Sequence, residues 1–355
     1  MVQAFGPVTI GFAALSLAIS VAGVWGSIRV AERVGMMDVP NERSSHSLPV
    51  PRMGGVPMVA AAALAFGGWT FLAGGEATIL KGLPYTFLFA LAMFLLGFYD
   101  DLRNLSPLFR FLVQFVSASL LLVFLAPVLP EIPLWKWVVP GWAWVFPGAF
   151  WAVWMLNLYN FMDGIDGLAG GEAVVASSFF FLVFAYYGES GWAVANLVVA
   201  AASMGFLVHN WPPARIFMGD AGSAFLGAFY GMQSVVAALS TPVPFPVLAL
   251  PFANFILDTT FTLFRRLIRR EKWYQAHRSH FYQRMTDLGM THKWVTSIEL
   301  LVVLASCAAA AVCIAVGPLV RIALVVSVTV GIACGGLWVW GKERPQNRDV
   351  PANSR

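Results

Sequence analysis

The main pattern along the chain is a series of apolar runs separated by short polar segments. A membrane-spanning helix needs about 20 mostly apolar residues, because the hydrocarbon core of a bilayer is about 30 Å thick. Runs near this length lie at residues 7–28, 54–74, 84–99, 108–128, 138–157, 168–187, 191–209, 222–240, 244–264, 295–317 and 319–341. The pattern predicts an all-α, polytopic integral membrane protein with about 11 transmembrane helices.

Composition supports the membrane class. Of the 355 residues, 59% are apolar and only 11% are charged, and the mean hydropathy is +0.74. A soluble protein of this length needs more charge to cover its surface. We expect residues 1–341 to form a single integral membrane domain and residues 342–355 to form a polar, disordered cytoplasmic tail. No nucleic-acid partner is expected, because the net charge of +4 follows mostly from topology.

Basic residues gather after alternate apolar runs. No Lys or Arg precedes Arg29, so the first run is expected to be a retained helix and not a signal peptide. With eleven helices and the N-terminus outside, 19 of the 22 Lys and Arg residues fall on the cytoplasmic side. This asymmetry follows the positive-inside rule and also predicts a cytoplasmic C-terminus.

Acidic residues are scarce, yet five aspartates lie in three clusters at the ends of apolar runs. The clusters are Asp100-Asp101, the Asn157 to Gly167 segment with Asp163 and Asp166, and Asp220. A carboxylate near hydrocarbon costs roughly 2.5–3.5 kcal/mol on insertion scales, so such residues are functional candidates. The predicted topology places all three clusters on the cytoplasmic face.

Each cluster alone also has a structural interpretation. Asp100-Asp101 is compatible with a solvated helix end. If helical, Asn160, Asp163 and Asp166 share one face, which suits a hard cation or a polar ligand, but a capped Gly-rich helix start has the same residues. Asp220 is compatible with a helix N-cap and equally with a metal or phosphate site.

Two basic segments offer groups for anions. His277 and His280 lie three residues apart, and phosphate positioning is favoured over a solvated pair or a zinc site, which lacks further local ligands. His46 and Arg52 precede Gly54-Gly55 in a segment that suits an anion or simply an entry into the membrane.

Taken together, the polar motifs on one face predict a membrane enzyme that handles a diphosphate. Mg²⁺ is the expected cofactor, with Mn²⁺ as an alternative, because Mg²⁺ binds a few carboxylates together with substrate phosphates. Asp258 and Glu172 lie within apolar runs and are expected to support or pair helices, without a catalytic role.

The motifs closely resemble those of the polyprenyl-phosphate N-acetylhexosamine-1-phosphate transferases. The resemblance covers Pro-Arg-Met-Gly-Gly at 51–55, Asp100-Asp101, residues 160–167, residues 210–222 and the histidines of 277–280. It implies that a UDP-N-acetylhexosamine and undecaprenyl phosphate give undecaprenyl-diphosphate-sugar and UMP. Membrane lipids are then partners, the site faces the cytoplasm at a bacterial inner membrane, and a homodimer is an open alternative.

The resemblance also implies roles for single residues. It makes Asp220, together with Asp100, a metal ligand. It makes Asp100, Asp101, His277 and His280 catalytic, with Asp100 orienting or deprotonating the lipid phosphate. It implies substrate contacts for His46, Arg52, Asn160, Asp163, Asp166, Asn210, Phe217 and Arg278, with Asp166 reading uracil and Phe217 stacking on the base. Direct attack is favoured over an aspartyl-phosphate intermediate.

Departures from the peptidoglycan branch concern the sugar. That branch has a Lys- and Thr-rich version of the 46–55 segment and three consecutive histidines, whereas this chain has His46, Arg52 and His-Arg-Ser-His. The chain resembles the branch that starts O-antigen and related glycans, with GlcNAc, FucNAc or QuiNAc as donor sugars and MurNAc-pentapeptide as the alternative.

Two other classes of membrane protein also carry functional acids but predict a different pattern around them. An ion-coupled transporter is expected to carry its acids near the bilayer midplane, whereas these acids crowd one end of the helices. A CDP-alcohol phosphotransferase needs Ala-Arg and two further acids after its second Asp, but here Gly170-Gly171 follow. The transporter stays an alternative and the CDP-alcohol enzyme is rejected.

Overall fold

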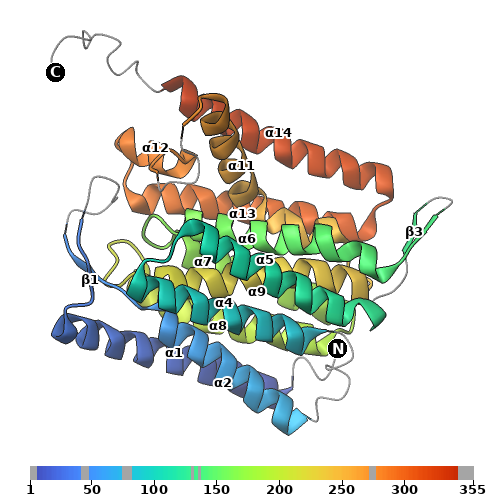
Figure 1. Ribbon diagram of the computed structural model, residues 1–355, viewed down its shortest axis with the longest axis horizontal. Helices are drawn as coiled ribbons and strands as arrows, with labels where there is room; N and C mark the ends of the chain where they lie inside the picture. Colours follow the sequence, from blue (N-terminus) through green and yellow to red (C-terminus); the bar gives the residue numbers. More distant parts are fainter. Residues whose placement is uncertain are drawn as a thin grey trace.

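Long helices that lie side by side form most of the computed structural model (Figure 1). The structure describes residues 6–40, 48–73, 82–128, 132–134, 137–271 and 277–342. The α-helices are α1 (Pro7–Val34), α2 (Gly55–Ala73), α4 (Leu83–Arg103), α5 (Pro107–Leu125), α6 (Val145–Met162), α7 (Leu168–Tyr186), α8 (Ser190–Asn210), α9 (Gly219–Ser240), α10 (Phe245–Ala249), α11 (Ala253–Ile268), α12 (Phe281–Asp287), α13 (His292–Ala315) and α14 (Pro318–Lys342).

Strands and 3₁₀ turns are short. The strands form two antiparallel pairs, β1 (Met37–Asp38) with β2 (Val50–Pro51) and β3 (Ile132–Leu134) with β4 (Trp137–Val139). The 3₁₀ turns are η1 (Ala126–Val128), η2 (Gly141–Trp144) and η3 (Leu250–Phe252). The first strand pair lies at one end of the bundle and the second at the other (Figure 1).

The all-α, multi-pass membrane architecture predicted from the apolar runs is confirmed. Ten helical stretches among the described residues are long and apolar enough to span a membrane, with α10, η3 and α11 counted as one stretch. Helix α6 runs beside them and corresponds to the one remaining predicted run, residues 138–157, the fifth along the chain. Its predicted start is wrong, because Pro140-Gly141 interrupts the run and α6 begins at Val145.

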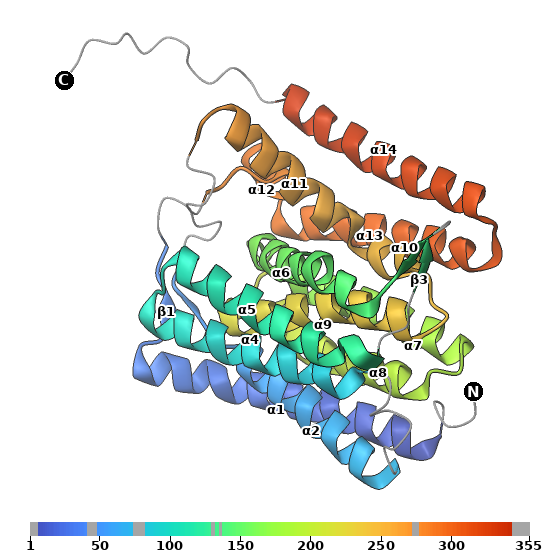
Figure 2. The ribbon, with the colours of Figure 1, turned by 45° about the vertical axis from the view of Figure 1, so that its right-hand side comes forward.

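The direction of the helices agrees with an odd number of crossings. Helix α1 begins at the β3–β4 end and finishes at the β1–β2 end, and α14 also finishes at the β1–β2 end (Figures 1 and 2). The described chain therefore starts and stops at opposite ends of the bundle, as eleven crossings require. Which end faces the cytoplasm stays a prediction, and the predicted tail beyond residue 342 lies outside the described residues.

Helix α9 forms the centre of the bundle, with every residue from Ala221 to Ala237 buried. Two glycines let neighbouring chain segments approach its first turn. A Cβ on Gly97 of α4 would collide with the backbone of Asp220 and Ala221, and a Cβ on Gly55 would lie 2.5 Å from the Cα of Gly222. These close approaches bring the end of α4 and the start of α2 to the N-terminus of α9.

Candidate active site

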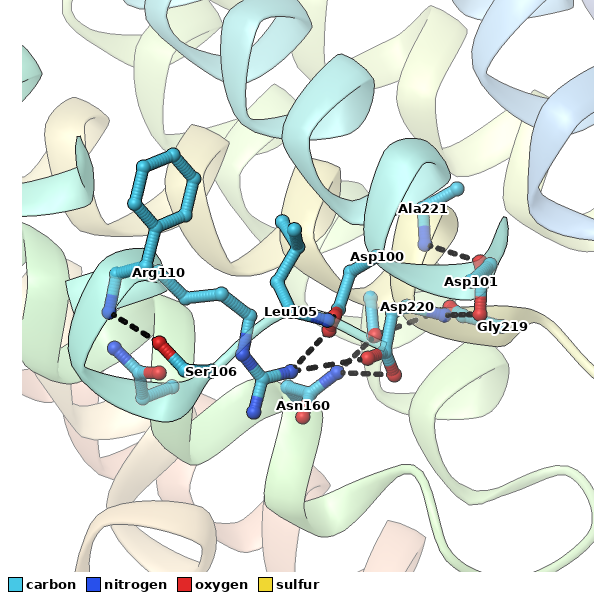
Figure 3. Close-up of polar contacts among 12 residues, drawn as sticks. Asp100, Asp101, Leu105, Ser106, Arg110, Asn160, Gly219, Asp220 and Ala221 are labelled. Atoms are coloured by element: carbon cyan, nitrogen blue, oxygen red, sulfur yellow. Dashed lines mark hydrogen bonds and ion pairs between the residues drawn. The ribbon is translucent and has the colours of Figure 1, made fainter. Parts of the chain in front are cut away.

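Four polar side chains from four helices meet at the N-terminus of α9 (Figure 3). Asp100 lies in the last turn of α4, Arg110 in the first turn of α5, Asn160 in the last turn of α6 and Asp220 in the first turn of α9. We call these four residues the aspartate centre. The structure thus brings together residues from all three clusters, although Asp100 and Asp220 are 120 residues apart in the sequence.

A guanidinium joins the two carboxylates of the aspartate centre. Nη1 of Arg110 donates to Oδ2 of Asp100 and to Oδ2 of Asp220, the latter at 3.2 Å. The amide of Asn160 donates to the other oxygen of Asp220 at 3.0 Å. The Asp100 side chain is 6% exposed and that of Asp220 is 38% exposed, so the centre opens on the Asp220 side.

The short α4–α5 connection explains how Arg110 reaches Asp100. Helix α4 ends at Arg103, the left-handed backbone of Asn104 (φ 51°) then turns the chain, and Ser106 caps the start of α5. The backbone N–H of Leu105 donates to Oδ1 of Asp100 at 2.6 Å. The turn is thereby fixed to the carboxylate, and Arg110 lies one helical turn beyond it.

Asp101 caps helix α9 from the end of α4. Its Oδ1 accepts the backbone N–H of Asp220 at 3.2 Å, and its Oδ2 accepts that of Ala221 at 3.1 Å. The chain passes closely here because Gly219 has φ +76°, and a Cβ there would lie 3.0 Å from Asp101. Since Asp101 caps the helix, the side chain of Asp220 stays available to other groups.

Asp163 follows the last residue of α6 and is half-buried. Burial raises the pKa of its carboxyl well above the usual value of 3.8, and the charges of Asp220 and Asp101 raise it further. Crowded carboxylates of this kind favour a cation beside them. The described residues contain no group of three acidic, His or Cys side chains placed to enclose a metal. Such an open donor set fits Mg²⁺, which keeps waters and binds substrate phosphates.

Two residues predicted to contact substrate, Asp166 and Asn210, bond to protein groups. Oδ2 of Asp166 accepts the backbone N–H of Ala214 at 3.1 Å, and its Oδ1 lies 3.2 Å from Nδ1 of His292. Asn210 is buried; its Oδ1 accepts the N–H of Gly167 at 2.9 Å, and its Nδ2 donates to the carbonyl oxygen of residue 216 at 2.8 Å. Both residues tie the α6–α7 loop to the α8–α9 loop.

The segment before α2 lies against the α8–α9 loop through backbone bonds. The N–H of Phe217 donates to the carbonyl of Pro51, and the N–H of Gly54 donates to the carbonyl of Phe217, both at 2.9 Å. Arg52 forms an ion pair with Asp38 of β1 at 2.5 Å. The structure therefore places Arg52 and Phe217 next to the site, whereas His46 lies outside the described residues.

His277 and His280 lie in one loop before α12, residues 277–280, which we call the histidine loop. The His280 side chain is buried, and its Nδ1 lies 3.0 Å from Oδ1 of Asp258. The ring centroids of His277 and His280 are 4.9 Å apart. Burial, together with the nearby His280 and Arg266, lowers the pKa of His277 from 6.5 to about 4. His277 is therefore a neutral imidazole near pH 7.

Asp258 of α11 organises this histidine loop. Its Oδ1 accepts the N–H of Phe281 at 3.0 Å and its Oδ2 accepts the N–H of Tyr282 at 3.2 Å, so it caps α12 while it holds His280. The expected supporting role of Asp258 agrees with these bonds. Arg278, predicted to contact substrate, lies 2.9 Å from Asp287 within the same segment.

The histidine loop contacts the segment that carries Asn160. The hydroxyl of Tyr282 donates to the carbonyl of Phe161 at 2.9 Å, and the rings of Phe161 and His280 are 6.2 Å apart. Because Phe161 directly follows Asn160, the loop stands beside the aspartate centre. The end of the bundle that bears β1, β2 and α12 thus contains all the described candidate residues (Figure 1).

Arg110 is the site residue that the sequence analysis missed. In the sequence, Arg110 counts only as one of the basic residues that favour the cytoplasmic side. A stronger signal was present, since Arg110 begins an apolar helix only ten residues after Asp100. A cation placed there has to lie near the acid pair if the connection between the two helices is short.

Comparisons with known proteins agree with this geometry. The family profile described as "Glycosyl transferase family 4" matches residues 83–238, a range that contains the whole aspartate centre. The "Probable undecaprenyl-phosphate N-acetylglucosaminyl 1-phosphate transferase" of Bacillus subtilis is 32% identical over 281 residues, covering 75% of this chain and 74% of that protein.

Two further relatives carry similar names. The "Decaprenyl-phosphate N-acetylglucosaminephosphotransferase" of Mycobacterium tuberculosis H37Rv is 28% identical, covering 77% of this chain and 74% of its own length. The "Undecaprenyl-phosphate alpha-N-acetylglucosaminyl 1-phosphate transferase" of Escherichia coli K12 is 25% identical, covering 75% of this chain and 73% of its own length. The matched part therefore extends well beyond residues 83–238.

Proposed function

Because the chain belongs to the polyprenyl-phosphate N-acetylhexosamine-1-phosphate transferases of glycosyltransferase family 4, we propose that it transfers N-acetylhexosamine 1-phosphate from a UDP-sugar to undecaprenyl phosphate. The products are undecaprenyl-diphosphate-sugar and UMP. The observation that carries the proposal is the aspartate centre, where side chains from four helices converge at the N-terminus of α9. Its position at one end of the bundle differs from the midplane site that an ion-coupled transporter favours.

In the proposed reaction, an oxygen of the lipid phosphate attacks the sugar-bearing phosphorus of the UDP-sugar directly. The bond from that phosphorus to the bridging oxygen breaks, and the bridging oxygen leaves with UMP. The attacking and leaving groups are both phosphates, so the protein has to align them and neutralise their charge. A cluster that contains both carboxylates and a guanidinium is suited to this task.

We assign the lipid phosphate to the Asp100 side of the centre. There Asp100 orients the phosphate or accepts its proton, and Arg110 offers a guanidinium that binds phosphate oxygens. Asp220 and Asp100 would hold Mg²⁺, or Mn²⁺ as an alternative. The bound ion would supply charge neutralisation of the diphosphate. Asp101 acts by holding the N-terminus of α9, and with it the Asp220 side chain, in place.

We assign the nucleotide to the neighbouring loops. Asn160 and Asp163 face that side from the end of α6, while Asp166 and Asn210 keep the loops in register. The proposed contacts of Asp166 with uracil and of Phe217 with the base face remain part of this assignment. His277 and His280 stand where the phosphates would meet the α12 loop.

The preferred donor is UDP-GlcNAc, because the relatives are named for N-acetylglucosamine. UDP-FucNAc and UDP-QuiNAc are the alternatives, and the product would start O-antigen or a related envelope glycan. A donor screen on purified protein with undecaprenyl phosphate tests the proposal, reading UMP release and the mass of the lipid product. We expect UMP and lipid-diphosphate-sugar in equal amounts, and their loss with EDTA. No product from any of the three donors would contradict the proposal.

The proposed site faces the cytoplasm at the bacterial inner membrane. The basic residues on the end that bears the site support this orientation. A cysteine at Leu48, which is 73% exposed, tests it in a Cys334→Ser background that removes an exposed native thiol. We expect a membrane-impermeant thiol reagent to label this cysteine in inverted vesicles and not in intact cells. Labelling in intact cells would reverse the orientation.

A further inference from the structure

A second polar cluster lies inside the bundle, away from the aspartate centre. Glu172 of α7 is fully buried, and neither of its carboxyl oxygens has a hydrogen-bond partner. Asn254, at the start of α11, is 3% exposed; its Nδ2 donates to Oε2 of Glu299 of α13 at 3.1 Å, and its Oδ1 has no partner. Buried polar atoms rarely lack partners, so this arrangement needs an explanation.

The three residues stand where the supports of the site meet. Glu172 follows the α6–α7 loop that carries Asp163 and Asp166. Asn254 lies one helical turn before Asp258, which holds the histidine loop. Glu299 lies three residues beyond Thr296, whose hydroxyl donates to the backbone oxygen of Asp166 at 2.7 Å. The cluster therefore connects α7, which follows the α6–α7 loop proposed to bind the nucleotide (the nucleotide loop), with α11, which holds the histidine loop through Asp258.

A count of donors and acceptors limits what the cluster can be. Ionised carboxylates and amide oxygens accept hydrogen bonds and donate none. The NH₂ group of Asn254 donates to Glu299, whereas the amide oxygen of Asn254 and both oxygens of Glu172 have no partner. If both carboxyl groups were ionised, these three buried atoms would all be acceptors without a donor. A proton on one carboxyl group would supply a hydrogen to the amide oxygen.

Among the described residues that interact with Glu172, no basic side chain is present to balance a negative charge on it. Glu172 interacts electrostatically with four titratable groups: Glu299 and Cys307 of α13, Tyr159 of α6 and Tyr230 of α9. None of these is basic, and the hydroxyl of Tyr230 already bonds to Ser177 and to a backbone carbonyl. An unpaired charge buried here would cost several kcal/mol. A shared hydrogen removes that cost.

We propose that Glu172 and Glu299 share one proton across the Asn254 amide, and that this hydrogen-bonded bridge positions the nucleotide loop relative to the histidine loop. The positioning part rests on the proposed function, whereas the shared proton does not. Within the bridge a carboxyl O–H donates to the amide oxygen, and the amide N–H donates to the other carboxyl group. Connected bonds of this kind in a low-dielectric interior hold their elements in one arrangement.

Infrared difference spectroscopy of the purified protein in lipid nanodiscs near neutral pH tests the shared proton. We expect the carbonyl stretch of a protonated carboxylic acid, shifted on exchange into deuterated buffer. Glu172→Gln and Glu299→Gln should each remove the same component of this band, because a glutamine N–H replaces the shared hydrogen, while a contribution from Asp163, whose carboxyl pKa is also raised, stays in both variants. The exposed Glu32→Gln is the control and should keep the band. Absence of the band in the unsubstituted protein, or an unchanged band in either glutamine variant, would overturn the proposal.

Activity of two variants at one position tests the positioning role. Glu172→Gln keeps a donor for Asn254 and should leave kcat and KM within about twofold, while Glu172→Leu removes it and should raise the KM for the UDP-sugar about tenfold or more. Equal effects of Gln and Leu would overturn the positioning role. If the protein transfers no sugar phosphate at all, the infrared band still decides the shared proton, so the two failures are distinguishable.

Discussion

Two aspartates at the same end of the bundle, each beside the start of a helix, are used in opposite ways. Asp258 accepts two backbone N–H groups of α12 and its side chain is only 6% exposed. Asp220 stands in the first turn of α9, yet it accepts from the side chains of Asn160 and Arg110 and is 38% exposed. The reason is Asp101, which takes the α9 amides in its place.

The difference separates carboxylates that build the site from carboxylates that act in it. A carboxylate whose oxygens accept buried backbone N–H groups cannot leave them without stranding those groups. A carboxylate held by side chains can exchange them for a metal or a phosphate. Substitutions in the aspartate centre should therefore lower activity, and substitutions of the groups that hold the histidine loop should lower the stability of the fold.

Removing the carboxylate charges of the aspartate centre should have the largest effect on activity. Asp220→Asn and Asp100→Asn should each lower kcat about 10²–10³-fold, since each removes a charge that acts on the transferring phosphate. The thermal unfolding midpoint of Asp220→Asn should change little, because the amide fits the same space, whereas that of Asp100→Asn should fall, because the buried Asp100 also accepts the backbone N–H of Leu105. UMP release and a melting curve on the same sample check both expectations. An active Asp220→Asn enzyme would remove Asp220 from the reaction.

Substitution of Arg110 should have the next largest effect on activity. Arg110→Ala should lower kcat/KM for undecaprenyl phosphate about 10–100-fold, which corresponds to one charge-assisted hydrogen bond of about 1.5–3 kcal/mol. Arg110→Lys keeps the charge but loses the planar fork, so it should recover only part of the loss. Steady-state kinetics over a range of lipid concentrations check this order. Equal activity of the Ala variant and the unsubstituted protein would show that Arg110 does not contact substrate.

Asp258→Asn should behave differently from the variants of the centre. The amide can accept only one of the two backbone bonds well, so we expect a loss of about 1–3 kcal/mol in unfolding free energy and a smaller loss of activity. Asp287→Asn is the matched control: this aspartate pairs with Arg278 in the same loop but is 51% exposed, so the change should be small. Equal stability of the two variants would contradict the capping role.

The smallest effect concerns the pH dependence of stability through His277. Its pKa is lowered from 6.5 to about 4 in the folded state, so between these values the unfolded state binds more protons. Stability therefore falls as the pH falls through this window and is unaffected by His277 above it. In His277→Gln this part of the dependence should vanish, which unfolding midpoints at the two ends of the window check. An unchanged slope of stability against pH would show that the His277 imidazole is exposed to water.

Hydropathy predicted the bundle well because crossing a bilayer imposes a length on every helix. It misplaced the start of α6, since Pro140-Gly141 breaks a run that is apolar throughout. The convergence of Asp100, Asn160 and Asp220 followed from topology alone: ends of helices on one face have to share a small area. The contact between α4 and α9 depends on Gly97, whose meaning shows only when the partner helix is known.

Roles of single residues were harder to predict, because they depend on which hydrogen bonds the fold has already used. Asp166 and Asn210 look like ligand residues in the sequence, yet both bond to loop backbone. Their substrate contacts stay predictions. Asp101 shares its motif with Asp100, and no spacing rule distinguishes the residue that caps α9 from the residue that faces Arg110.

The most direct test of the central claim follows the phosphate itself. Purified protein is incubated with undecaprenyl phosphate and UDP-GlcNAc that carries a radiolabel only in the sugar-bearing phosphate. The account predicts label in the lipid product and unlabelled UMP, with both lost in Asp220→Asn. Label recovered as UDP beside a glycosylated lipid would mean that the sugar moves without its phosphate, and would contradict the proposed function.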